Sequence, residues 1–178
     1  MKMIKESDLK TLFSEEIIQK SIKDLAIKLN EEYKNEELHL VCVLKGSVMF
    51  MVDLAKHLKM PVNMEFIRLS SYGSGFTSTG RVSAVDIALP DLNGKNVLII
   101  EDIIDTGHTA RFLMDFINHN FKPKALKFCS LLDKKCKREV DIDPDYHCLD
   151  VDDKFLVGYG LDYDGYFRNI PYIGYVEM

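Results

Sequence analysis

The sequence contains no tryptophan, only five prolines and ten glycines among its 178 residues. So little glycine and proline excludes a collagen-like chain, and a hydrophobic content of 47% excludes disorder as the main state. No apolar run approaches the roughly 18 residues that a membrane-spanning helix needs. Residues 1–13 mix lysines with acidic residues, which is unlike a signal peptide. We therefore expect a cytoplasmic protein without membrane contact.

The sequence also has few cysteines, and none of the four belongs to a Cys-x-x-Cys pair, which excludes zinc-ribbon and thioredoxin sites. Cys42 and Cys129 lie inside apolar runs and are expected to be buried and reduced. The five histidines show no metal-ligand spacing and are expected to be structural or exposed. The formal net charge of −5 argues against general nucleic-acid binding, which needs a basic surface.

The length corresponds to about one domain, and we expect a single domain over residues 1–178. Apolar residues at three- and four-residue spacing predict helices, two of which Ser14 and Ser47 are expected to cap. The predicted helices cover 14–33, 47–58 and 109–121. The predicted strands cover 38–44, 64–69, 81–87, 97–100, 125–132, 155–157 and 172–176. This alternation predicts an α/β fold with a doubly wound, mainly parallel sheet.

Polar segments interrupt the chain where three of these strands end, at 45–47, 101–109 and 133–134. Ligands of open parallel sheets bind outside the carboxyl ends of the strands. We therefore expect the three segments to lie on one rim and to form the site.

The segment 97–109 carries the strongest chemical signal. Its last residues, Thr-Gly-His-Thr, open a helix, whose N-terminal N–H groups favour a phosphate. Gly107 permits a ligand to approach the backbone closely, and the hydroxyls of Thr106 and Thr109 can donate further hydrogen bonds. Glu101 and Asp102 would repel a bare phosphate, so they are expected to face sugar hydroxyls or Mg²⁺. The pattern predicts a phosphorylated sugar and a metal; the alternative is that these acids only cap a solvent-exposed turn.

Residues 97–109 resemble the phosphoribosyl-pyrophosphate-binding motif of the phosphoribosyltransferases. Three more segments narrow the resemblance to the bacterial hypoxanthine-guanine phosphoribosyltransferase family: Leu-Lys-Gly-Ser at 44–47, Ser-Ser-Tyr-Gly at 70–73, and Asp-Lys-Phe-Leu-Val-Gly-Tyr-Gly-Leu-Asp-Tyr at 153–163. The resemblance covers about residues 10–178. It implies the type I phosphoribosyltransferase fold, with a small hood formed by terminal segments and a flexible lid over 70–80.

The resemblance implies a glycosyltransferase of purine salvage. Its substrates would be phosphoribosyl pyrophosphate and a 6-oxopurine, hypoxanthine or guanine. Its products would be IMP or GMP and pyrophosphate, with Mg²⁺ as cofactor and a homodimer or homotetramer as the assembly. Two alternatives remain open: a regulator of the same fold that senses phosphoribosyl pyrophosphate, and an enzyme for another base, with xanthine as a side activity.

For the sugar-phosphate end, the resemblance assigns roles to consecutive residues. The 5′-phosphate would be held by the loop of Asp105, Thr106, Gly107, His108 and Thr109. Glu101 and Asp102 would contact the ribose hydroxyls directly or through Mg²⁺, and Asp105 would be the catalytic proton-transfer residue near purine N7. Lys45 and Gly46 would form a pyrophosphate loop whose Leu44–Lys45 peptide can be cis. His108 departs from the Lys or Asn that close relatives often carry.

For the purine end, Lys134 would donate to the 6-oxygen, which suits a carbonyl and not the amino group of adenine. Phe155 would stack on the purine, and the Leu156 backbone would meet its edge. Asp162 would bind the second Mg²⁺, and Arg168 would reach the pyrophosphate. The pair Ser71–Tyr72 would close over the ligands.

Some nearby residues are expected to have structural or solvated roles. Lys135, Lys137 and Arg138 are interpreted as solvated charges, and four tyrosines are interpreted as packing residues: Tyr159, Tyr163, Tyr166 and Tyr172. The acidic stretch 149–153 is unexpected beside an anionic substrate and has no functional explanation from the sequence.

Overall fold

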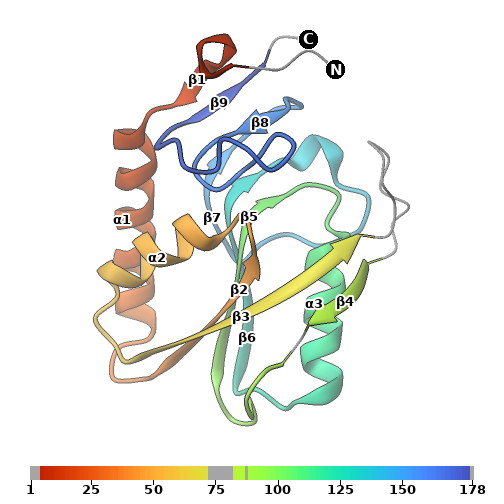
Figure 1. Cartoon of the computed structure of the whole chain (residues 1–178). Helices are drawn as coiled ribbons and strands as arrows, with labels where there is room; N and C mark the ends of the chain where they lie inside the picture. Colours follow the sequence, from red (N-terminus) through yellow and green to blue (C-terminus); the bar gives the residue numbers. More distant parts are fainter. Residues whose placement is uncertain (1–4, 72–81, 87, 177–178) are drawn as a thin grey trace.

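The computed structural model describes residues 5–71, 82–86 and 88–176. A six-stranded sheet with the order β4-β3-β2-β5-β6-β7 forms its centre (Figure 1). Five neighbouring strands run parallel: β2 (Leu38–Leu44), β3 (Val62–Ser71), β5 (Asn96–Ile104), β6 (Ala125–Asp133) and β7 (Tyr146–Asp150). The edge strand β4 (Val82–Asp86) is antiparallel to β3. The predicted mainly parallel sheet is confirmed.

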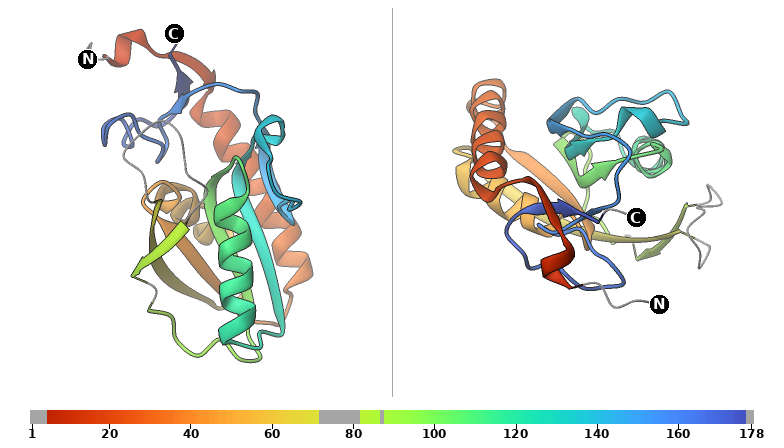
Figure 2. Two further views of the ribbon diagram at one scale, coloured as in Figure 1. Left: turned by 90° about the vertical axis from the view of Figure 1, so that its right-hand side faces the viewer. Right: turned by 90° about the horizontal axis from the view of Figure 1, so that it is seen from above.

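Helices cover both faces of this sheet, as Figure 2 shows from above. α1 (Glu15–Glu32) and α2 (Val48–His57) lie on one face and α3 (His108–Asn120) on the other. The Ser14 hydroxyl caps α1 by accepting from the Ile17 N–H at 3.4 Å, as predicted. Ser47 does not cap α2. Its backbone is already helical, and its buried hydroxyl donates to the Val43 carbonyl at 2.6 Å.

The apolar core consists of two layers, one on each side of the sheet. In β2, Leu40 and Cys42 pack with α1 and α2, whereas Val41 and Val43 pack toward α3. A strand buried on both faces needs apolar residues at every position, which explains the uninterrupted apolar run. Cys42 and Cys129 are buried and free, as predicted. No helix among the described residues has the length and apolarity to cross a membrane.

A second, three-stranded sheet caps the carboxyl ends of the parallel strands (Figure 1). It joins β1 (Lys10–Phe13), β9 (Ile173–Tyr175) and β8 (Leu156–Val157), all antiparallel. We call this sheet and the loop 158–172 the hood. It is built from terminal segments, as the sequence predicted.

Two strands extend further than predicted into the polar segments at their ends. β5 continues to Ile104, so Glu101 and Asp102 lie within the strand, where Glu101, Ile103 and Ile104 still pair with β6. β3 continues to Ser71, because Ser70 and Ser71 pair with residues of β4. The start of the predicted lid is therefore strand; the rest of it, including Tyr72, lies outside the described residues.

Candidate active site

The three polar segments meet on one rim, as predicted. β2, β5 and β6 are adjacent and parallel, so the segments that follow them emerge side by side at their carboxyl ends. The hood lies over the same end. The site therefore lies between the rim and the hood.

Gly46, in the Lys45–Ser47 loop, closely approaches the Asp102 side chain and the backbone of the hood. The Leu44–Lys45 peptide bond is cis. A Cβ atom on Gly46 would lie 1.6 Å from Oδ2 of Asp102, so a larger residue would displace the Asp102 carboxylate. A Cβ atom on Gly160 of the hood would lie 1.9 Å from the Gly46 carbonyl oxygen. These contacts bring β2, β5 and the hood together at one point.

The loop 105–109 leads directly into the N-terminus of α3. Gly107 has φ +87°, and a Cβ atom there would lie 2.8 Å from both Val140 and Ile142. Glycine is therefore required by conformation and by space. The first turn of a helix has N–H groups without intrahelical partners, so this loop can bind a phosphate. The His108 ring lies 2.9 Å from the Glu139 carboxylate.

The acidic pair on β5, Glu101 and Asp102, has raised pKa values. Burial raises the pKa of Glu101 well above its ordinary value, and the Asp102 charge adds to the increase. Burial raises the pKa of Asp102 to about 6; backbone hydrogen bonds and Arg168 oppose this increase, and Asp162 adds to it. Among the described residues, no side-chain cation forms an ion pair with either carboxylate. Oxygen-only ligands with unbalanced negative charge fit a hard divalent cation such as Mg²⁺.

At the other end of the rim, Lys134 and Asp105 lie close together. The buried Lys134 Nζ donates to the Lys154 carbonyl at 2.9 Å and lies 3.9 Å from Oδ2 of Asp105. Oδ1 of Asp105 has no hydrogen-bond partner among the described residues. Phe155 is 37% exposed and meets the Tyr163 ring edge-on, whereas Leu156 is buried. Lys134 thus joins Asp105 to residue 154, the residue that precedes Phe155.

The hood supplies two more of the predicted residues. Arg168 forms an ion pair with Asp162 at 2.6 Å and donates to the Gly160 carbonyl at 2.6 Å. The electrostatic effect of both side chains on Asp102 places them near the acidic pair. The predicted site residues on β2, β5, β6 and the hood therefore come together. Ser71 ends β3, and Tyr72 is not described.

Comparison with known proteins agrees with this geometry. The phosphoribosyl transferase domain family matches residues 8–164. Proteins named hypoxanthine-guanine phosphoribosyltransferase from Streptococcus thermophilus (strain CNRZ 1066) and Bacillus subtilis (strain 168) are each 42% identical over 175 residues, which is 98% of this chain and 97% of theirs. The chain belongs to the hypoxanthine-guanine phosphoribosyltransferase family.

Solved structures of this family share the fold. A hypoxanthine phosphoribosyltransferase from Staphylococcus aureus superposes with a TM-score of 0.91 at 39% identity, over 99% of this chain and 96% of that one. A hypoxanthine-guanine phosphoribosyltransferase from Bacillus anthracis gives a TM-score of 0.89 at 43% identity, over 94% and 98%. The type I phosphoribosyltransferase fold and the expectation of a glycosyltransferase enzyme of purine salvage are confirmed. These relatives are named as enzymes and give the alternative of a sensor no support.

Arg138 is a site residue that the sequence analysis missed. The side chain is only 13% exposed and donates to Asp133 at 2.5 Å and to the Asp105 carbonyl at 2.5 Å. The interpretation of Arg138 as a solvated charge is therefore wrong. The sequence did contain a signal for a buried role of Arg138. Asp133 directly ends a buried strand, and a carboxylate at such a position needs a cation nearby. Tyr166, 70% exposed, also differs from its predicted packing role.

The acidic stretch 149–153 pairs with the basic run that follows β6. Lys135 Nζ lies 3.5 Å from Oδ1 of Asp150, and Lys137 Nζ lies 2.7 Å from Oδ2 of Asp153. Lys135 and Lys137 are exposed, as predicted. Asp150 and Asp153 therefore pair with cations of the adjacent segment, and Asp153 also lies 3.9 Å from Lys134 Nζ.

Asp133, His147 and Asp150 form a further group whose ligand atoms lie within 4.8 Å of one another. Pairing of β6 with β7 creates it, which the linear spacing of the histidines did not indicate. However, Lys135 lies 3.8 Å from one Asp133 oxygen and 3.5 Å from Asp150, and a guanidinium occupies the other Asp133 oxygen. These cations already neutralise the group, so we assign no metal to it.

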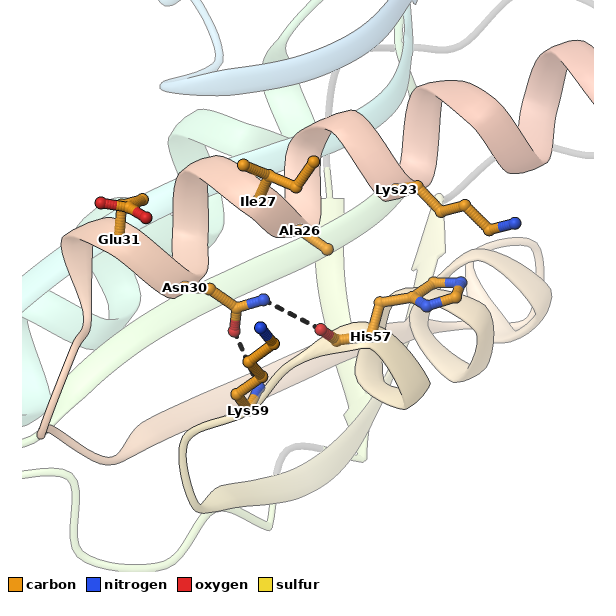
Figure 3. A pocket seen from close by; sticks show the side chains of 7 residues that line it. All are labelled: Lys23, Ala26, Ile27, Asn30, Glu31, His57 and Lys59. Atoms are coloured by element: carbon orange, nitrogen blue, oxygen red, sulfur yellow. Dashed lines mark hydrogen bonds between the residues drawn. The ribbon is translucent and has the colours of Figure 1, made fainter.

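A pocket between α1 and the end of α2 is lined by Lys23, Ala26, Ile27, Asn30, Glu31, His57 and Lys59 (Figure 3). The Asn30 side chain donates to the His57 carbonyl at 2.9 Å and accepts from the Lys59 N–H at 2.7 Å. Asn30 thus provides hydrogen-bond partners for backbone groups at the end of α2. We interpret the pocket as the gap between two packed helices, separate from the rim.

Replacing Asp102 with asparagine is expected to stabilise the ligand-free protein at pH 8 by about 1–3 kcal/mol. Folding raises the pKa of Asp102 from 3.8 to about 6. Ionisation of this carboxyl group therefore destabilises the folded state, beginning near pH 4 and reaching its full effect near pH 6. The gain should grow between pH 4 and 6, stay constant above, and vanish below pH 4. Urea unfolding of both proteins across this range measures it; equal stability at pH 8 would contradict the assignment.

Proposed function

We propose that the chain transfers the 5-phosphoribosyl group of phosphoribosyl pyrophosphate to N9 of hypoxanthine or guanine. The bond from C1 of the ribose to pyrophosphate breaks, the C1–N9 bond forms, and the purine loses one proton. The products are IMP or GMP and pyrophosphate. The observation that carries this proposal is the pairing of Lys134 with Asp105, 3.9 Å apart, beside a phosphate-binding helix N-terminus.

In this mechanism the chain mainly positions its substrates and balances charge. The loop 105–109 binds the 5′-phosphate through backbone N–H groups and threonine hydroxyls. Arg168 and the Lys45–Gly46 loop bind the pyrophosphate, where negative charge grows as the bond to C1 breaks. Asp105 accepts the purine proton near N7, and its half-exposed carboxylate lies 3.9 Å from Lys134.

We further propose that Mg²⁺ is the cofactor and that Glu101, Asp102 and Asp162 hold it, directly or through ribose hydroxyls. The unbalanced charge of the buried pair supports this assignment. When bound, Mg²⁺ would neutralise the pyrophosphate group of the substrate.

Lys134 is proposed to select 6-oxopurines, since an ammonium only donates hydrogen bonds and adenine presents an amino group there. Lys134→Ala should weaken hypoxanthine binding by about 1.5–3 kcal/mol, the contribution of a hydrogen bond to a charged group. Steady-state kinetics with hypoxanthine as the varied substrate measures this as a rise in KM. Lys135→Ala, which removes an exposed lysine, is the matched control. An unchanged KM for Lys134→Ala would remove this residue from base recognition.

The proposed function is tested by product formation from phosphoribosyl pyrophosphate and each of hypoxanthine, guanine, xanthine and adenine, with and without Mg²⁺. We expect turnover of hypoxanthine or guanine that requires Mg²⁺, and none of adenine. Activity with adenine would contradict the role of Lys134. Binding of phosphoribosyl pyrophosphate without turnover of any base would favour a sensor.

A homodimer or homotetramer also remains our proposal. Met64 and Phe66 lie on the α1–α2 side of β3 and are 38% and 45% exposed, and Met49 of α2 is 40% exposed. Such apolar residues are suited to contact a second copy. The single domain over 1–178, the cytoplasmic location and the closing of Ser71–Tyr72 over the ligands stay predictions from the sequence.

A further inference from the structure

Tyr159 of the hood forms a part-buried hydrogen bond to α2, the helix that follows the Lys45–Ser47 loop. Its side chain is only 5% exposed, and its hydroxyl donates to Oδ2 of Asp53 on α2 at 2.7 Å. Gln19 of α1 donates to the same oxygen at 2.7 Å, and Lys56 donates to the other at 3.0 Å. These partners lower the pKa of Asp53 despite its burial, so the tyrosine hydroxyl meets a charged acceptor.

The backbone around Tyr159 has an unusual conformation. Gly158, Tyr159 and Gly160 have φ values of +104°, +47° and +99°, three consecutive residues in the left-handed region. Glycine adopts this region easily, whereas tyrosine does so at a cost. A side chain held in this conformation needs compensating contacts, and the bond to Asp53 is one of them. The hydrogen bond therefore helps to hold the 158–160 turn, together with the turn's backbone hydrogen bonds to Leu161, Ile170 and Arg168.

This turn lies against the Lys45–Gly46 loop. Gly160 approaches the Gly46 carbonyl so closely that a Cβ atom would overlap it, and Gly46 approaches Asp102 in the same way. Gly160 also exchanges hydrogen bonds with Arg168: its N–H donates to the Arg168 carbonyl at 2.9 Å, and its carbonyl accepts from the guanidinium at 2.6 Å. A shift of the turn would therefore move Gly46 and Arg168 together.

Together, these contacts link α2, the hood turn and the Lys45–Ser47 loop to one another. α2 begins at Val48, immediately after the Lys45–Ser47 loop, and carries Asp53. Asp53 binds Tyr159, and the next residue, Gly160, returns to Gly46. We propose that Tyr159 and Asp53 are positioning residues that lock the hood turn onto the Lys45–Gly46 loop and so set the pyrophosphate end of the site. This inference rests on the proposed function for its kinetic meaning.

The base end is built from other contacts. Lys134 is held by the Lys154 carbonyl, and Arg138 holds the Asp105 carbonyl. Neither contact involves Tyr159 or Asp53. Loss of the Tyr159 hydroxyl should therefore affect phosphoribosyl pyrophosphate and pyrophosphate, but not the purine.

The test is Tyr159→Phe, which keeps the ring and removes the hydroxyl. We expect the KM for phosphoribosyl pyrophosphate and the inhibition constant of pyrophosphate to rise about tenfold, with the KM for hypoxanthine unchanged. Tyr146→Phe is the matched control, because it removes the hydrogen bond that Tyr146 on β7 donates to the Glu32 carboxylate at the end of α1. Asp53→Asn combined with Tyr159→Phe should give less than the sum of the two single effects. Equal changes in both KM values, or the same behaviour as Tyr146→Phe, would overturn the proposal.

Hydrogen exchange of the ligand-free protein separates this inference from the proposed function. Tyr159→Phe should speed exchange in peptides covering 45–47 and 158–160, whereas Tyr146→Phe should leave both at the wild-type rate. Wild-type exchange at 45–47 in Tyr159→Phe would disprove the coupling whatever reaction the enzyme catalyses. An inactive wild-type protein with the expected exchange would contradict only the proposed function.

Discussion

Asp105→Asn is expected to lower kcat by about 10²- to 10⁴-fold, the usual contribution of a general acid or base. Asparagine has nearly the same shape and still accepts hydrogen bonds, but it takes up no proton at neutral pH. The carboxylate is half-exposed and makes no side-chain hydrogen bond among the described residues, so its loss should leave the fold intact. Turnover should fall because the purine proton loses its acceptor.

The same variant separates proton transfer from binding. The backbone of the loop 105–109 is unchanged in Asp105→Asn, so the KM for phosphoribosyl pyrophosphate should stay within about threefold of wild type, since no ground-state contact to the phosphate is removed. Steady-state kinetics with both substrates varied gives kcat and each KM. Asp115→Asn, an exposed change on α3, is the matched control. Near-normal turnover of Asp105→Asn would remove this residue from the proton-transfer role.

Helices and strands with a fully buried face could be predicted from the sequence, because their apolar residues form a regular pattern. The continuous run Leu38–Leu44 and the regular spacing in α1 leave few alternatives, and both match the structure. β7 was missed because it is an edge strand whose residues are mostly half-buried, so Tyr146–Asp150 shows no apolar run. β1 is short and largely exposed, and only its pairing with β9 makes it a strand.

The residues of the site also fall into a group that the sequence predicts and a group that it does not. Residues 101–109 are consecutive, so their chemistry can be read together in the sequence. The supporting contacts are long-range: Tyr159 meets Asp53 across 106 positions, and Arg138 meets Asp105 across 33. Whether a charge such as Arg138 is solvated or buried depends on the tertiary packing. Local patterns therefore identify the groups that meet the substrate but not the groups that hold them.

Arg138→Met should lower the free energy of unfolding by about 3–5 kcal/mol, because it leaves a buried carboxylate without its partner. The Asp133 side chain is fully buried, and its remaining cation, Lys135, lies 3.8 Å from the other oxygen. Urea unfolding followed by circular dichroism measures the loss. Lys135→Met removes an exposed cation and should cost less than about 1 kcal/mol. Similar losses for the two variants would mean that the buried pair does not stabilise the fold.

A second substitution distinguishes the two contacts that Arg138 makes. Asp133→Asn added to Arg138→Met removes the uncompensated charge, so much of the lost stability should return. Activity should not return with it, because the Asp105 carbonyl still lacks its donor and the loop 105–109 is free to shift. Recovery of stability without recovery of kcat would show that Arg138 positions Asp105 in addition to neutralising Asp133. Recovery of both would mean that its contribution to catalysis is only through the stability of the fold.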